Sequence, residues 1–198
     1  MRTGIYGGTF NPIHLGHLIM AVESLHQLEL DRVMFLPAPQ PPHKQGQKIL
    51  SFEARCEMVE AAIKDEPLFE LSLIENERPG PHYALDTIND LHKKYPDCEF
   101  VFLLGGDSLR NLHRWYRAAD FVAACNGFGV FRRPDGLVDL NEIIGELPGL
   151  TGKIEVVEGR LLDIASSDIR ARIKEGQPFR YFLTEAVYEI IQKNEFYS

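Results

Sequence analysis

The chain has 198 residues, 44% of them hydrophobic and 25% charged, and a net charge of −8. The acidic balance argues against broad, sequence-independent binding to nucleic acid, which needs a basic surface. No apolar run reaches the length of a membrane span, no signal-peptide pattern precedes the first strand, and the three cysteines are scattered without a CxxC pair. We therefore expect one domain over residues 1–198, in the reducing cytoplasm, with neither nucleic acid nor membrane as a partner.

Short strand-like apolar runs alternate with amphipathic stretches along the chain. Strands are expected at Arg2–Tyr6, Arg32–Leu36, Phe69–Ile74, Glu99–Leu104, Gly127–Phe131 and Lys153–Val157. Helices are expected at Leu15–Glu29, Phe52–Lys64, Tyr83–Tyr95, Leu137–Glu146, Ser166–Glu175 and Thr184–Lys193. This order predicts an α/β fold with a single doubly wound, mostly parallel sheet followed by C-terminal helices. Ligands of such sheets bind beyond the carboxyl ends of the strands.

The segment GGTFNPIHLGH, residues 7–17, lies between the first expected strand and the first expected helix. Gly7 and Gly8 allow a tight turn and a close approach to a ligand, and the helix N-terminus presents N–H groups to an anion. His14 and His17 can donate to a phosphoryl oxygen whose charge grows during a reaction. The segment thus predicts phosphate chemistry. A zinc pair is the alternative, but no further residues of suitable spacing supply a third ligand, so no protein-bound metal is expected.

A second segment, IASSDIRARI at residues 164–173, has the same character. Ser166 and Ser167 stand at a predicted helix start, and Arg170 follows one turn later, so their hydroxyl and guanidinium groups can hold phosphate oxygens. Serines are also good helix N-caps, so a capped, solvated helix ending at Gly176 is the alternative for this segment alone. Ser51 and Thr184 are the expected caps of two other helices.

Together the two segments resemble the nucleotidyltransferase superfamily with the HxGH signature, whose members join a nucleotide to a phosphate monoester and release pyrophosphate. PAPQPPHK (37–44), RPGPHYALDTI (78–88), GGDSLRNLHRWY (105–116) and FRRPD (131–135) are similar, in order, to segments of bacterial nicotinate mononucleotide adenylyltransferases. The resemblance implies a Rossmann-like fold, with ATP and nicotinate mononucleotide as substrates in NAD biosynthesis. It also implies Mg²⁺ bound through the substrate phosphates.

The resemblance further implies roles for individual residues. The expected catalytic residues are His14, His17 and Arg170, with His17 stabilising the transition state. The expected ATP-binding residues are Gly7, Gly8, Thr9, Phe10, His14, His17, Gly105, Ser166, Ser167 and Arg170. The expected acceptor-binding residues are Lys44, Tyr83, Ala84, Thr87, Asp107, Trp115 and Arg133. By residue type alone, Trp115 also fits a core position and Asp107 also fits a helix cap.

Several positions depart from the usual pattern of that family. Asn11 replaces Asp, Ala165 replaces a Ser, and His82 and Ala84 replace polar residues in the stretch that lines the pyridine pocket. The last two changes keep nicotinamide mononucleotide open as an acceptor. Phosphopantetheine adenylyl transfer, cytidylyl transfer and a non-catalytic nucleotide-binding module are further alternatives. A relative of the class I tRNA synthetases is disfavoured because the chain lacks a KMSKS-like loop. The sequence allows a homo-oligomer.

Overall fold

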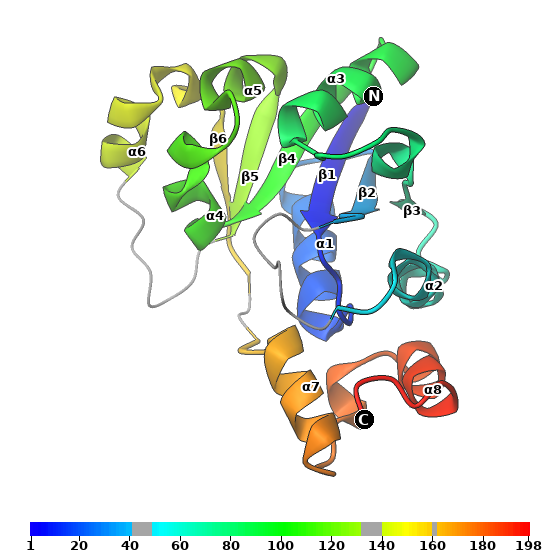
Figure 1. The fold of residues 1–198 in the computed structure, drawn as a ribbon. Coiled ribbons are helices and arrows are strands. Elements are labelled where there is room, and N and C mark those ends of the chain that lie inside the picture. The colour runs from blue at the N-terminus through cyan, green and yellow to red at the C-terminus, as the bar shows by residue number, and fades with distance from the viewer. Residues whose placement is uncertain (41–48, 132–139, 160–161) are drawn as a thin grey trace.

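A computed structural model describes residues 1–40, 49–131, 140–159 and 162–198. It contains one six-stranded sheet in which every neighbouring pair is parallel, in the order β3-β2-β1-β4-β5-β6 (Figure 1). The strands are β1 Arg2–Gly8, β2 Arg32–Pro37, β3 Phe69–Leu71, β4 Glu99–Gly105, β5 Gly127–Phe131 and β6 Ile154–Val157. The strand order reverses between β1 and β4, which makes this the topological switch point of a doubly wound sheet. The predicted fold class is confirmed.

The helices are α1 Leu15–Gln27, α2 Phe52–Ile63, α3 Ala84–Lys94, α4 Gly106–Arg110, α5 Ala118–Ala124, α6 Leu140–Glu146, α7 Ser166–Lys174 and α8 Glu185–Lys193. The six expected helices are present, with ends shifted by a few residues where both ends are described. The expected third strand is shorter because a 3₁₀ turn takes over at Ile74–Glu77. Helices α4 and α5 were not among the expected helices, although Asp107 was considered as a helix cap, because elements of five and seven residues are too short to show a helical period. None of the described helices is long and apolar enough to cross a membrane.

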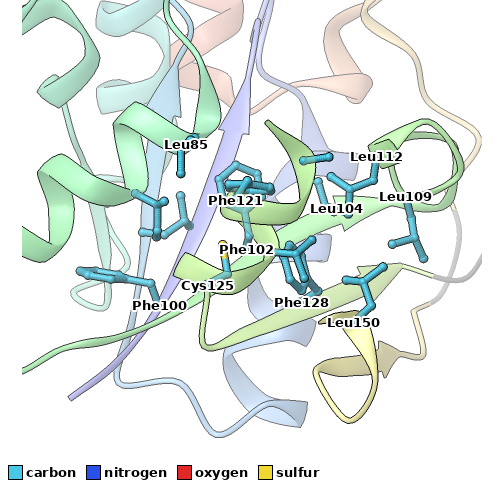
Figure 2. Packing of buried hydrophobic residues seen from close by; sticks show 14 of the residues in the cluster. Leu85, Phe100, Phe102, Leu104, Leu109, Leu112, Phe121, Cys125, Phe128 and Leu150 are labelled. Atoms are coloured by element: carbon cyan, nitrogen blue, oxygen red, sulfur yellow. The ribbon is translucent and has the colours of Figure 1, made fainter. Parts of the chain in front are cut away.

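Both faces of the sheet are covered, and β4 shows how. Its residues alternate in direction, so Phe100, Phe102 and Leu104 pack under α3, α5 and α6 while Val101 and Leu103 pack against the opposite layer. Figure 2 shows the first of these clusters, in which the Phe121 ring meets Phe102 edge-on at 5.1 Å and Phe128 at 5.7 Å. Close-packed aromatic rings of this kind join α5 to β4 and β5.

The opposite face is covered by α1 and α2, and the buried cluster there extends to the two C-terminal helices. Ile169 of α7 and the pair Val187 and Ile191 of α8 join the same buried cluster as Met58 and Val59 of α2. In Figure 1, α7 and α8 lie past the carboxyl ends of the central strands rather than over the sheet face. The end of the chain is therefore placed beside the switch point.

The predicted helix ends are confirmed in three cases and wrong in one. Ser51 accepts from the N–H of Ala54, Thr184 accepts from the N–H of Val187, and Gly176 ends α7 with a φ of 67°. The expected capping of α7 by Ser166 and Ser167 is wrong. The N-cap residue is Ala165, whose methyl side chain cannot accept a hydrogen bond from the helix backbone. The Ser166 hydroxyl instead donates to the carbonyl of Pro12, a contact 154 residues away that no local pattern indicates.

Candidate active site

The pairing of β1 with β4 stops before these strands end at the switch point, which is where ligands of doubly wound sheets bind. The ladder between these strands ends where Ile5 lies opposite Phe102, although both strands continue for three more residues to Gly8 and Gly105. A Cβ atom placed on Gly105 would meet open space. Residues 9–17, which carry His14 and His17, follow the end of β1, and the GGDS segment, residues 105–108, begins at the end of β4.

The turn after β1 is shaped by Phe10. Phe10 adopts a left-handed backbone conformation, with a φ of 48°, and its ring folds back so that a Cβ on Gly8 would lie 2.8 Å from it. Glycine is therefore required at position 8. The Phe10 ring is buried beside Tyr6 and Phe35, at 5.7 and 5.9 Å. The ring therefore belongs to the core and is not available to contact a ligand.

The two histidines form one unit at the start of α1. Their rings stack with centroids 3.7 Å apart, and the backbone N–H of His14 donates to Nδ1 of His17 at 3.2 Å. Because Nδ1 of His17 accepts this bond, a neutral ring carries its proton on Nε2. A Cβ on Gly16 would lie 3.0 Å from the His14 ring, which explains the glycine between the histidines.

His14 is buried, with 7% of its surface exposed, and its Nδ1 has no hydrogen-bond partner among the described residues. Burial lowers the pKa of His14 to about 4, because the protonated ring loses its hydration. His14 is therefore neutral at pH 7. It acts there as a dipole and not as a cation.

The structure brings α7 directly against this turn. Arg170 Nη1 donates to the carbonyl of Asn11 at 2.8 Å, and Ser166 Oγ donates to the carbonyl of Pro12 at 2.9 Å. Ser167 is exposed, and its hydroxyl donates to the Asp168 carboxylate at 3.2 Å. The two segments that the sequence marked separately as anion-binding thus lie side by side, more than 150 residues apart in the chain.

Arg55 of α2 also holds this turn, and the sequence did not indicate it. Its guanidinium donates to the carbonyls of Thr9 at 2.8 Å, Leu50 at 3.2 Å and Pro39 at 3.2 Å. The side chain is only 1% exposed, and burial lowers its pKa. An arginine in an amphipathic helix normally indicates a solvated face. A single buried group therefore joins the turn after β1 to the segment after β2.

Among the residues that the resemblance assigns to the acceptor, Tyr83 takes part in a stack of two tyrosines. Tyr83, the N-cap residue of α3, stacks on Tyr116 with centroids 4.0 Å apart and the planes 19° from parallel. Tyr116 is half-exposed. Trp115, which the resemblance pairs with Tyr83, packs instead on the Phe102 and Phe121 rings at the edge of the core. Its neighbour Tyr116, which the sequence analysis did not select, is the ring that meets Tyr83.

Thr87 lies beneath this stack. It is 1% exposed, its hydroxyl donates to Glu75 at 2.7 Å, and it accepts from Arg78 at 2.9 Å. Arg78 also pairs with Asp90 and donates to the carbonyl of Tyr83. Burial raises the pKa of Glu75. The network fixes the first turn of α3, which begins at Ala84, and thereby places the Tyr83 ring.

Asp107 is in the first turn of α4 and forms an ion pair with Arg110 on the surface. Gly105 is the N-cap residue of α4, so the alternative in which Asp107 caps this helix is wrong. Lys44 and Arg133 lie outside the described residues. Among the described residues, no group of three or more His, Cys, Asp or Glu side chains could hold a metal ion.

Comparison with known proteins shows which family the chain belongs to. Residues 5–172 match the family model described as cytidylyltransferase-like. A protein of Thermomicrobium roseum named "Probable nicotinate-nucleotide adenylyltransferase" is 42% identical over 196 residues, 99% of this chain and 91% of the relative. A protein of the same name from Desulfitobacterium hafniense is 38% identical, over 99% of this chain and 95% of the relative. The chain therefore belongs to the cytidylyltransferase-like family and, within it, to the nicotinate-nucleotide adenylyltransferases.

The fold has a close counterpart among solved structures. The nicotinic acid mononucleotide adenylyltransferase of Plasmodium falciparum, complexed with NaAD, superposes with a TM-score of 0.82. The match covers 99% of this chain and 97% of that chain at 18% identity. At this identity the likeness establishes the fold alone.

Proposed function

We propose that this protein transfers the adenylyl group of ATP to nicotinate mononucleotide, giving nicotinate adenine dinucleotide and pyrophosphate in NAD biosynthesis. Family membership supports this reaction. The structural observation that carries it is the contact of α7 with the histidine turn, through Arg170 and Ser166, at the switch point of the sheet. Helix N-termini that face one site provide donors for several phosphate groups at once.

The reaction is an in-line displacement at the α-phosphorus of ATP. An oxygen of the acceptor 5′-phosphate forms the new P–O bond, and the bond to the bridging oxygen of the β-phosphate breaks, so that pyrophosphate leaves. No covalent enzyme intermediate is needed. The attacking phosphate is already ionised near neutral pH, so the protein positions the reactants and stabilises charge without acting as a general base.

His17 is the donor best prepared for the α-phosphate. The bond from the His14 backbone to Nδ1 leaves Nε2–H as the donating group, so the ring needs no protonation to act. His14, held neutral by burial, stacks on the His17 ring and fixes its plane. A preorganised donor stabilises charge that develops in the transition state.

Arg170 and the start of α7 hold the departing β- and γ-phosphates. Only Nη1 of Arg170 is engaged with Asn11, and a guanidinium has five N–H groups, so others can bind phosphate oxygens. Ser166 already donates its hydroxyl proton to Pro12, and therefore its backbone N–H and that of Ser167 are the groups offered to the anion. Gly7, Gly8, Thr9, Phe10 and Gly105 line the nucleotide through their main chain.

On the acceptor side, Tyr83 and Tyr116 supply ring surfaces for the pyridine, Trp115 and Thr87 support them, and Ala84 and Asp107 border the same side. Lys44 and Arg133 are the proposed phosphate partners from outside the described residues. Mg²⁺ is proposed to arrive with ATP, held by phosphate oxygens and water, and to neutralise phosphate charge. Mg²⁺ commonly keeps several waters and binds through substrate phosphates.

We further propose that residues 1–198 act as one nucleotidyltransferase domain, because the site joins Gly7 at one end of the chain to α7 near the other. The cysteines Cys56, Cys98 and Cys125 are free thiols, which suits a cytoplasmic location.

The test is pyrophosphate release by the purified protein with Mg-ATP and one of three acceptors: nicotinate mononucleotide, nicotinamide mononucleotide or phosphopantetheine, with products identified by mass. We expect nicotinate mononucleotide to be strongly preferred. Preference for either other acceptor would retain the phosphate chemistry and replace the proposed substrate. Absence of turnover with all three, together with ATP binding, would indicate a binding module. The His17→Ala variant, purified in parallel, controls for contaminating activity.

A further inference from the structure

The side chain and carbonyl of Asn11 form a junction between three distant parts of the chain. Asn11 Oδ1 accepts from the Tyr197 hydroxyl at 2.8 Å and from the N–H of Leu50 at 3.3 Å. The carbonyl of the same residue accepts from Arg170 at 2.8 Å. Asn11 is 3% exposed, so these bonds are largely shielded from water. These bonds join Asn11 to Leu50 just before α2, to Arg170 in α7 and to Tyr197 after α8.

Tyr197 is held in place to make this bond. It has a left-handed backbone, with a φ of 69°, which is unfavourable for a residue with a side chain and persists where the surroundings impose it. Its ring packs at the border of the cluster formed by α1, α2, α7 and α8, beside Phe196 at 6.3 Å. Burial raises the pKa of Tyr197, so the phenol keeps its proton and remains a donor.

We infer that Tyr197 is a positioning residue for the ATP site, acting through Asn11 on the turn that presents His14 and His17. Without the hydroxyl, a buried amide oxygen loses its shortest bond, and the carboxamide is free to rotate away from Leu50. Arg170 contacts the carbonyl of the same residue, so a shift of Asn11 also moves the phosphate-binding guanidinium. The inference rests on the proposed function only for its effect on ATP.

The first test needs no nucleotide. Tyr197→Phe removes the hydroxyl and keeps the ring, and Tyr181→Phe is the matched control because Tyr181 is 86% exposed. Amide hydrogen exchange is followed by mass spectrometry in peptides that cover residues 7–17. We expect exchange to be about three- to tenfold faster in Tyr197→Phe and unchanged in Tyr181→Phe, as for the loss of one buried hydrogen bond. Unchanged exchange in Tyr197→Phe would overturn the inference.

The second test asks whether the effect reaches the ATP site selectively. We expect Tyr197→Phe to raise the Kd of a non-hydrolysable ATP analogue by about three- to tenfold and to leave the KM of the pyridine nucleotide unchanged. If the substitution only destabilised the protein, the Tm would fall, but the Kd of the ATP analogue would not rise relative to the KM of the pyridine nucleotide. In a double-mutant cycle with Asn11→Ala, the loss caused by Tyr197→Phe should largely disappear; full additivity would contradict the coupling. A wild-type protein that fails to bind the analogue would refute the proposed function, and the exchange test would still decide the role of Tyr197.

Discussion

The proposed ATP side and the proposed acceptor side of the site are organised in different ways. On the ATP side, hydrogen bonds from α2, α7 and Tyr197 meet at the main chain and side chains of residues 9–12. On the acceptor side, Tyr83 and Tyr116 stack on each other at the surface, and Asp107 pairs with its neighbour Arg110.

This difference indicates which side changes on binding. Bonds from several remote elements preorganise the ATP side, so its donors need little rearrangement. The proposed acceptor side is a ring stack in which Tyr116 is half-exposed, and we expect a pyridine ring either to separate the two tyrosines or to stack on the exposed ring. Substitutions should accordingly affect the two substrates differently.

The largest effect is expected from His17→Ala. Loss of one preorganised donor to the developing charge should lower kcat by about 100- to 1,000-fold, or about 3 kcal/mol. Pyrophosphate release measures this, and His26→Ala, an exposed position in the last turn of α1, is the control. A His17→Ala enzyme with near-normal kcat would remove His17 from the mechanism.

The buried His14 predicts a pH-dependent stability. The unfolded ring titrates near 6.5 and the folded ring near 4, so between these values the unfolded state binds more protons. The contribution is complete above pH 6.5 and is lost as the pH falls towards 4, by on the order of 2–3 kcal/mol. Urea unfolding from pH 7 to 4 should show a steeper loss for the wild type than for His14→Asn. Parallel pH curves for the two proteins would contradict this assignment.

Arg55→Met should destabilise the protein as a whole and the ATP side in particular. The carbonyls of Thr9, Leu50 and Pro39 would lose a shared donor in a buried place, at a cost of about 2 kcal/mol in the free energy of unfolding. Urea denaturation measures the cost. Arg180→Met, which removes an exposed ion pair with Glu185, is the control and should have the smaller effect. If Arg55→Met and Arg180→Met lowered the free energy of unfolding equally, the buried bonds of Arg55 would contribute no more than an exposed ion pair.

The smallest effect is expected from Tyr116→Ala. Loss of one stacking ring should raise the KM of the acceptor about fivefold, equivalent to about 1 kcal/mol, and leave the ATP affinity unchanged. Steady-state kinetics with each substrate varied in turn separates the two constants. A rise in the Kd of ATP of the same size would mean that the two sides are not independent.

The fold was largely predictable because its signals are local. The apolar run of β4 and the periodic pattern of α3 indicate their own structures, and chain order alone indicates a parallel sheet with its site at the strand ends. The two segments were predicted to bind anions from glycine, histidine and serine at helix starts. Their direct contact was not, because Ser166 and Pro12 are joined by tertiary packing alone.

The missed residues share a physical reason. Arg55 and Tyr197 act through bonds to backbone or amide groups that the sequence does not mark as special. Thr87 and Trp115 were placed at the acceptor by resemblance, and the structure shows that each is engaged with protein groups. A side chain can face a ligand, or it can support another side chain that faces the ligand. A small change in helix orientation decides between these roles, and local sequence carries little of that information.

The position of α7 in the chain has a consequence for biosynthesis. The last strand of the sheet ends at Val157, and the residues that close the turn at Asn11 come later, from Ser166 to Tyr197. At about 5–20 residues per second, a ribosome needs roughly 2–8 s to make this remaining stretch. The histidine turn can therefore gain its contacts with α7 and Tyr197 only after this region has been synthesised and has left the ribosome.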